Sequence, residues 1–160
     1  MNDKIEFILT KEYKKFEEFC NSCKDYRYIG LCYGAPGIGK TLSANRYSDW
    51  NKLKQYYDLN LQNFINNRKL IAIPDRILEC DTIVETVSAT NTPIRIEKSI
   101  FYNAKMLKFI QKSNITEEYH KVFDISDEEK FSAVKLVIID EADHLKYSSI
   151  EQLRNIYDRF

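Results

Sequence analysis

The loop from Gly34 to Thr41 has residue types and spacing that suit phosphate binding. It reads Gly-Ala-Pro-Gly-Ile-Gly-Lys-Thr and matches the P-loop pattern G-x-x-x-x-G-K-[ST]. Its glycines allow successive backbone N–H groups to curl around the phosphates of a nucleotide without a Cβ clash. Lys40 is expected to reach the β- and γ-phosphates as a catalytic residue, and the Thr41 hydroxyl is expected to hold Mg²⁺.

A second group that could do chemistry lies in the C-terminal part of the sequence. The apolar run Leu-Val-Ile-Ile at residues 136–139 is followed by Asp140 and Glu141, which is the form of a Walker B strand. A buried parallel strand would deliver Asp140 to the sheet edge where ligands bind, so its carboxylate is predicted to hold Mg²⁺ beside Thr41. Glu141 is predicted to polarise the water that attacks the γ-phosphate. The two motifs together predict ATP binding and, conditionally, ATP hydrolysis.

The elements that must position these groups are indicated by the flanking residues. A short apolar run at residues 29–33 predicts a buried strand that leads into the loop. The residues after Lys40 predict a helix that runs towards Leu53, whose first-turn N–H groups would point at the bound anion. Strand, phosphate loop and helix in this order are the structural context that the motif requires.

The other segments predict an α/β fold. Thr10 is expected to cap a helix over residues 11–23, and the β-branched run at residues 81–87 predicts a strand of the same sheet. Residues 71–74 are predicted to be extended, with Pro74 limiting them to a sheet edge or a connection. Two further helices are expected, at residues 96–112 and after a capping box at residues 148–151.

Length and composition favour one soluble domain over residues 1–160. The 24 basic and 24 acidic residues cancel, so no global field draws the protein to nucleic acid or membrane. The charged N-terminus and the absence of a long apolar run predict a cytoplasmic protein without a membrane partner. Lys98, Lys105 and Lys112, at heptad spacing, form one local basic ridge that is the best candidate for a DNA contact, although charge on the outer face of an amphipathic helix usually serves solubility alone.

The four cysteines include a C-x-x-C pair, Cys20 and Cys23, so zinc or redox chemistry must be considered. These two residues fall on the apolar face of the first predicted helix, and Cys32 falls in the predicted P-loop strand. Because no second ligand pair follows at zinc spacing, we expect packing roles in a reducing compartment.

Several P-loop classes conflict with the order of motifs. Residues 140–143 spell the Asp-Glu-Ala-Asp box of RNA helicases, but the Ser-Ala-Thr motif, which follows that box in helicases, precedes it here at residues 88–90. A GTPase would need an Asn-Lys-x-Asp motif for base recognition. A small-molecule kinase would leave Glu141 unexplained.

The segments at residues 29–50 and 137–159 resemble AAA+ ATPases of the TniB and phage Mu B type, which regulate DNA transposition. The resemblance includes the Leu-Ser-Ala sequence after the P-loop and the Glu-Gln-Leu-Arg-x-Ile-Tyr-Asp-Arg helix after Asp140. It implies a three-layer α/β sandwich with a mostly parallel sheet. It also implies nonspecific DNA binding, ATP-dependent homo-oligomers and a transposase partner. The resemblance implies that the residues at matching positions contact the nucleotide, and it places Tyr28 and Ile29 beside adenine. The implied contacts are Tyr28, Ile29, Ala35, Pro36, Gly37, Ile38, Gly39, Lys40, Thr41 and Leu42.

The resemblance also implies elements that this sequence does not contain. The family continues into a strand with a polar sensor residue and then into a helical lid with further arginines, so residues 1–160 correspond to the N-terminal part of its ATPase domain. In the related fold the missing strand lies between the P-loop strand and the Walker B strand. Two alternatives therefore stay open: a helicase-loader ATPase, and a nucleotide-dependent interaction module without useful hydrolysis.

Overall fold

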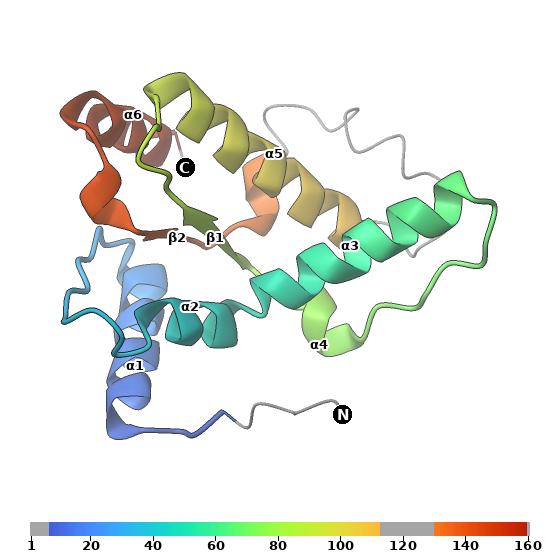
Figure 1. The fold of residues 1–160 in the computed structure, drawn as a ribbon, viewed down its shortest axis with the longest axis horizontal. Coiled ribbons are helices and arrows are strands. Elements are labelled where there is room, and N and C mark those ends of the chain that lie inside the picture. The colour runs from blue at the N-terminus through green and yellow to red at the C-terminus, as the bar shows by residue number, and fades with distance from the viewer. Residues whose placement is uncertain (1–6, 113–129, 160) are drawn as a thin grey trace.

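The computed structural model describes residues 7–112 and 130–159 (Figure 1). Helices dominate, and two strands lie between them. In chain order the elements are α1 Lys11–Tyr26, α2 Lys40–Ser48, α3 Trp50–Ile65, α4 Asp75–Leu78, β1 Thr82–Thr86, α5 Pro93–Lys112, the 3-10 helix η2 Lys130–Ala133, β2 Leu136–Asp140, the 3-10 helix η3 Ala142–His144, and α6 Tyr147–Tyr157. Within the described residues, no helix is long and apolar enough to cross a membrane.

The sheet consists of β1 and β2, which pair in parallel. The register runs from Thr82 opposite Leu136 to Thr86 opposite Asp140. Parallel neighbours need a long crossover, and α5 lies in the stretch of chain that joins the two strands. The strand predicted at residues 81–87 and the Walker B strand are therefore confirmed, and their shared carboxyl-terminal edge carries Asp140.

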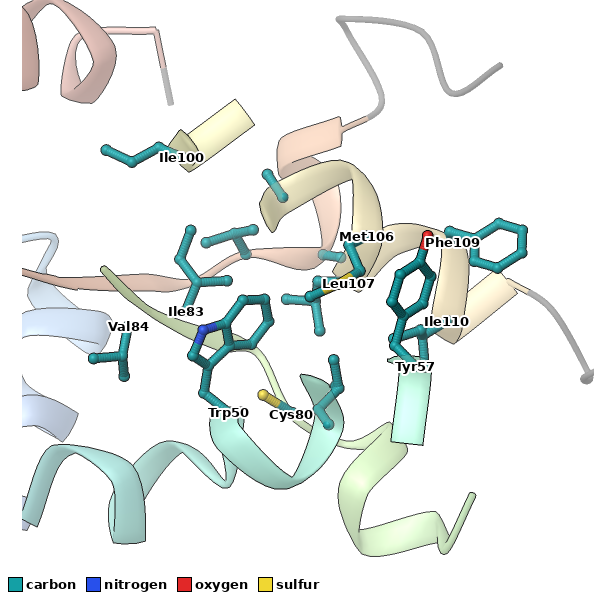
Figure 2. Packing of buried hydrophobic residues seen from close by; sticks show 14 of the residues in the cluster. Trp50, Tyr57, Cys80, Ile83, Val84, Ile100, Met106, Leu107, Phe109 and Ile110 are labelled. Carbon is teal, nitrogen blue, oxygen red and sulfur yellow. The ribbon is translucent and has the colours of Figure 1, made fainter. Parts of the chain in front are cut away.

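The helices form a layer on each side of this sheet. Figure 1 shows α5 and α6 on one side, and α1, α2 and α3 on the other. The predicted α/β architecture with parallel pairing is thus confirmed for the part of the chain that the structure describes. The core between α3, α5 and the sheet contains large side chains that are almost fully buried (Figure 2): Trp50, Leu53, Tyr57, Ile83, Ile100, Met106, Leu107 and Ile110.

Helix α1 confirms the predicted N-terminal helix. The Thr10 hydroxyl accepts a hydrogen bond from the Tyr13 backbone N–H at 3.1 Å, which is the expected N-cap contact. The helix continues to Tyr26, beyond the predicted end at Cys23, and stops where Arg27 adopts a left-handed conformation with φ of 53°. It carries Cys20 and Cys23 into the interior.

The helix predicted after the P-loop is two helices. Asp49, with φ of 49°, ends α2 and precedes α3, and its carboxylate pairs with Lys52 at 2.6 Å and Arg76 at 3.1 Å. Helix α3 then extends well past the predicted end near Leu53, because buried residues recur on one face as far as Asn60. The Asn60 side chain holds the following segment, exchanging two hydrogen bonds with the backbone of Ile71 at 2.7 and 2.8 Å.

Removing a buried leucine from this core tests the packing. We expect Leu53→Ala to lower the free energy of unfolding by about 3 kcal/mol, because Leu53 has no exposed surface and its loss leaves a cavity. Urea unfolding followed by Trp50 fluorescence measures the change. Leu59→Ala on the exposed side of α3 is the control, with an expected change below about 0.5 kcal/mol. Equal losses in the two variants would contradict the described core.

The predicted P-loop strand is wrong. Residues 28–35 have no regular structure, and Ile29, Leu31 and Tyr33 are 74%, 77% and 87% exposed rather than buried. The physical reason is that a strand needs a neighbour to pair its backbone groups. β2 is paired with β1, and among the described residues no other strand adjoins the segment.

The segment is held instead by its contact with α1. A Cβ atom on Gly30 would lie 2.3 Å from the Phe19 ring and 2.7 Å from the Cys23 sulfur, so only glycine allows this close approach. Cys32, which was expected inside the strand, is exposed with the rest of the segment.

The predicted capping box is also wrong. Helix α6 begins at Tyr147, and its N-cap is Lys146, which makes no side-chain cap. Ser149 lies inside the first turn and is fully buried. Its hydroxyl donates to the side chain of Asn91 at 2.9 Å instead of capping the helix. Ser148, the residue that the pattern assigns to the cap, therefore lies inside the helix, and its neighbour Ser149 bonds to a partner far away in the sequence.

Candidate nucleotide-binding site

The P-loop joins the extended segment to α2 through two left-handed glycines. Gly37 has φ of 79° and Gly39 has φ of 87°, a region in which residues with a Cβ are strained. Gly39 is the N-cap of α2, and no side chain caps the helix there. The N–H groups of the first turn and the helix dipole are therefore directed towards the loop, where an anion can accept from them.

Lys40 lies folded over its own loop. Its ammonium donates to the carbonyl oxygens of Gly34 at 2.9 Å and Ala35 at 3.1 Å. The ammonium is thus held against the backbone at the start of the loop. A bound triphosphate would offer charged oxygens in exchange for these two neutral acceptors, and such hydrogen bonds are stronger.

Thr41 and Asp140 meet although 99 residues separate them. The Thr41 hydroxyl donates to Oδ2 of Asp140 at 2.9 Å. Helix α2 brings Thr41 to the sheet from the first turn, and the end of β2 delivers Asp140. A hydroxyl and a carboxylate are hard oxygen ligands of the kind that Mg²⁺ takes. The residues predicted to hold the metal therefore lie together and suit that ion.

Glu141 directly follows β2 and has an unusual backbone. Its φ is 56°, a left-handed conformation that is uncommon for a residue with a side chain. The conformation turns the chain sharply from β2 into η3, and it leaves the Glu141 side chain exposed. Strain of this kind persists where surrounding contacts impose it, and it often marks functional sites.

The residues after β2 bring further potential ligand atoms together. Carboxylate and ring atoms of Glu141, Asp143 and His144 lie within 4.8 Å of one another, and all three residues are exposed. Exposed acidic groups often cluster without an ion, so this arrangement does not define a metal site. The metal ligands predicted from the sequence, Thr41 and Asp140, stay a prediction.

Four other predicted nucleotide contacts are exposed. Ile38 lies in the loop and Leu42 directly follows it, and both side chains are exposed. Tyr28 stacks on Tyr26, with ring centroids 5.5 Å apart, and Ile29 is exposed beside it. The adenine contact assigned to Tyr28 and Ile29 stays a prediction.

Burial determines the chemistry of the cysteines in the described structure. Burial raises the pKa of Cys20 to about 12 and that of Cys80 to about 11. Thiols with such pKa values stay protonated near neutral pH and are poor nucleophiles and metal ligands. Packing is therefore the role that the geometry supports for Cys20 and Cys80.

Sequence reasoning missed Asn91, a residue next to the site. Asn91 hydrogen bonds to the backbone of His144 and to Ser149, and so connects the turn after β1 with the turn after β2. The only sequence signal was the turn-forming composition of residues 88–93. A turn signal gives the local conformation but not the partner across the sheet.

Comparisons with known proteins agree with this geometry. A family model described as an AAA domain matches residues 23–160. A Staphylococcus aureus protein described as a potential ATP-binding protein is 35% identical over 158 residues, which cover 99% of this chain and 56% of that protein. The chain therefore spans little more than half the length of that relative. Among solved structures no match was found.

Proposed function

Because the chain belongs to the AAA domain family, we propose that it binds ATP with Mg²⁺ at residues 34–41 and Asp140. The observation that carries this proposal is the 2.9 Å hydrogen bond between Thr41 and Asp140, which brings the two predicted metal ligands together beside the P-loop. Mg²⁺, when bound, supplies positive charge that offsets the negative charge of the phosphates. The first-turn N–H groups of α2 and the Lys40 ammonium supply further donors to the phosphates. The relative described as a potential ATP-binding protein supports the same ligand.

We further propose that Glu141 makes the site a hydrolase by orienting a water towards the γ-phosphate. Its position after β2, one residue beyond Asp140, supports this role, and its exposed side chain is accessible to water. The rival proposal is a nucleotide-dependent interaction module that binds ATP without useful turnover. Both proposals share the same binding site, so they differ only in what happens to the bound ATP.

Glu141→Gln separates these two functions. We expect the substitution to lower phosphate release about 100-fold or more and to leave the ATP dissociation constant unchanged within about twofold, because the amide cannot accept a proton from water. A steady-state phosphate assay and an equilibrium ATP titration give the two values. Asp143→Asn, another exposed acid of the same turn, is the control and should retain turnover. Wild-type turnover no higher than that of Glu141→Gln would favour the interaction module.

The wider role that we propose is regulation of DNA transposition, through binding of target DNA and contact with a transposase. The resemblance of residues 29–50 and 137–159 to ATPases of the TniB and phage Mu B type supports this role. Helix α5 supplies one possible DNA contact, because Lys98 is exposed on it and Lys105 is partly buried nearby. The side chain of Lys112, the third residue of the predicted ridge, lies outside the described residues.

Fluorescence anisotropy with a labelled duplex tests this role. The proposal predicts salt-sensitive DNA binding that is stronger with ATP than with ADP, together with ATP-dependent homo-oligomers in sedimentation. Lys98→Glu should weaken DNA binding, and Lys11→Glu on the exposed side of α1 should not. Capture of a replicative helicase, with no transposase bound, would instead support the helicase-loader alternative.

A further inference from the structure

A buried hydrogen-bond network connects three elements next to the proposed nucleotide site. The Asn91 side-chain amide donates to the Ser88 carbonyl at 2.9 Å and to the His144 carbonyl at 2.7 Å. Its carbonyl oxygen accepts from the Ser149 hydroxyl at 2.9 Å. Asn91 and Ser149 are buried. One side chain thus bonds to the turn after β1, the turn after β2 and the first turn of α6.

The middle contact of this network fixes the turn that begins with Glu141. The His144 backbone N–H donates to the Glu141 carbonyl at 3.0 Å, and the His144 carbonyl is the group that Asn91 binds. The His144 ring lies near the other strand, with Nδ1 3.1 Å from the Val87 carbonyl oxygen. His144 is therefore held from two sides by the chain that follows β1, and the turn from Glu141 to His144 is held with it.

Such support is needed because Glu141 is strained. A left-handed residue with a side chain costs of order 1–2 kcal/mol relative to the usual right-handed conformation. The Glu141 side chain itself is exposed, so its packing contributes little to holding that conformation. Contacts to the backbone of the turn must therefore hold the left-handed conformation. The buried Asn91 side-chain amide donates one of these contacts, to the His144 carbonyl.

We propose that Asn91 is a positioning residue for the turn from Glu141 to His144, and that Ser149 orients the Asn91 amide for this task. Because the amide oxygen of Asn91 accepts from Ser149, the amide nitrogen on the other side points at the carbonyls of Ser88 and His144. Helix α6 is thereby coupled to the direction in which Glu141 points. Any partner or chain segment that moves α6 would act on the acid of the proposed site through this contact.

Hydrogen exchange of the whole chain, without nucleotide, tests the assignment directly. Asn91→Asp keeps the size of the side chain and the acceptor for Ser149 but removes both N–H donors. Ser149→Ala removes the hydroxyl that orients the amide. We expect exchange of the amides at residues 141–145 to become about tenfold faster in Asn91→Asp and about threefold faster in Ser149→Ala. The controls are Thr90→Ala in the turn after β1 and Ser148→Ala in the first turn of α6, both at exposed positions. Their exchange rates at residues 141–145 should match those of the wild type.

Three outcomes of this experiment decide the matter. Faster exchange confined to residues 141–145 and the adjoining turn supports the assignment. Unchanged exchange there in a folded variant overturns it, and so does equally faster exchange in α3, since that would give Asn91 only a general structural role. If Asn91→Asp does not fold, Ser149→Ala decides alone, because it removes a single buried hydroxyl.

A second measurement connects the turn with ATP, and this part rests on the proposed function. The ratio of ATP affinity in Mg²⁺ to that in EDTA should fall about threefold in Ser149→Ala, because Asp140 adjoins the loosened turn. If the affinity ratio is unchanged while the amides of residues 141–145 exchange faster, Asn91 positions the turn that begins with Glu141 but does not affect Asp140. If the wild type binds no ATP, the proposed function fails while the exchange experiment still decides the role of Asn91.

Discussion

Lys40→Ala is expected to weaken ATP binding about 100-fold or more, equivalent to about 2.7 kcal/mol of binding free energy. The ammonium lies 2.9 and 3.1 Å from two P-loop carbonyl oxygens, so it is already held at the loop that would receive the phosphates. Phosphate oxygens would replace these neutral acceptors, and the charge-assisted contacts would be lost in the variant. Competition against a fluorescent ATP analogue measures the affinity over this range.

The control for Lys40→Ala is Lys14→Ala. Lys14 is an exposed lysine on α1, so the substitution removes the same charge at a position away from the loop. It should bind ATP within about twofold of the wild type, since a distant exposed charge is screened by salt. Equal ATP affinity in wild type and Lys40→Ala would contradict the assignment of residues 34–41 as the phosphate site.

Asp140→Asn is expected to remove most of the Mg²⁺ dependence of ATP binding. The amide oxygen can still accept the Thr41 hydrogen bond that the carboxylate accepts at 2.9 Å, but the negative charge that favours a divalent cation is gone. We expect ATP affinity in Mg²⁺ to fall about tenfold or more while affinity in EDTA stays within about threefold. Parallel titrations in Mg²⁺ and EDTA give the two values.

Asp143→Asn provides the matched control for Asp140→Asn. Asp143 lies in the turn that follows β2 and is exposed near Glu141 and His144. Its removal should leave the Mg²⁺ dependence intact if Thr41 and Asp140 hold the ion. A larger effect at Asp143 than at Asp140 would move the metal site into the cluster after β2 and contradict the present assignment.

The site could be predicted because its two halves are local motifs. A glycine-rich loop before a helix, and an acid after an apolar strand, each specify a conformation through neighbouring residues alone. Thr41 and Asp140 meet although the predicted P-loop strand is absent, because α2, which carries Thr41, lies against both strands of the sheet. The helices α1 and α5 were predictable from the apolar stripe that each buries, and β1 was predictable from its β-branched residues, three of which are buried in succession.

The errors arose where conformation depends on distant partners. The apolar pattern of residues 29–33 indicates a buried strand, but burial needs a paired neighbour, and the segment lies exposed against Phe19 of α1 instead. The helix breaks at Asp49, which is left-handed and pairs with Arg76, a partner 27 residues away that no local pattern signals. Ser148 fits a capping box by sequence, yet α6 begins at Tyr147, one residue earlier, and the adjacent Ser149 hydroxyl bonds to Asn91. Contacts of this kind are tertiary and lie outside what a window of sequence can show.

Calorimetric titration of the wild-type chain with ATP, in Mg²⁺ and again in EDTA, tests the central claim most directly. The claim is that the P-loop and Asp140 form one site for ATP and Mg²⁺. We predict saturable binding of one ATP per chain, at least about tenfold tighter in Mg²⁺ than in EDTA. Absence of saturable binding, or an affinity that Mg²⁺ does not change, would contradict it.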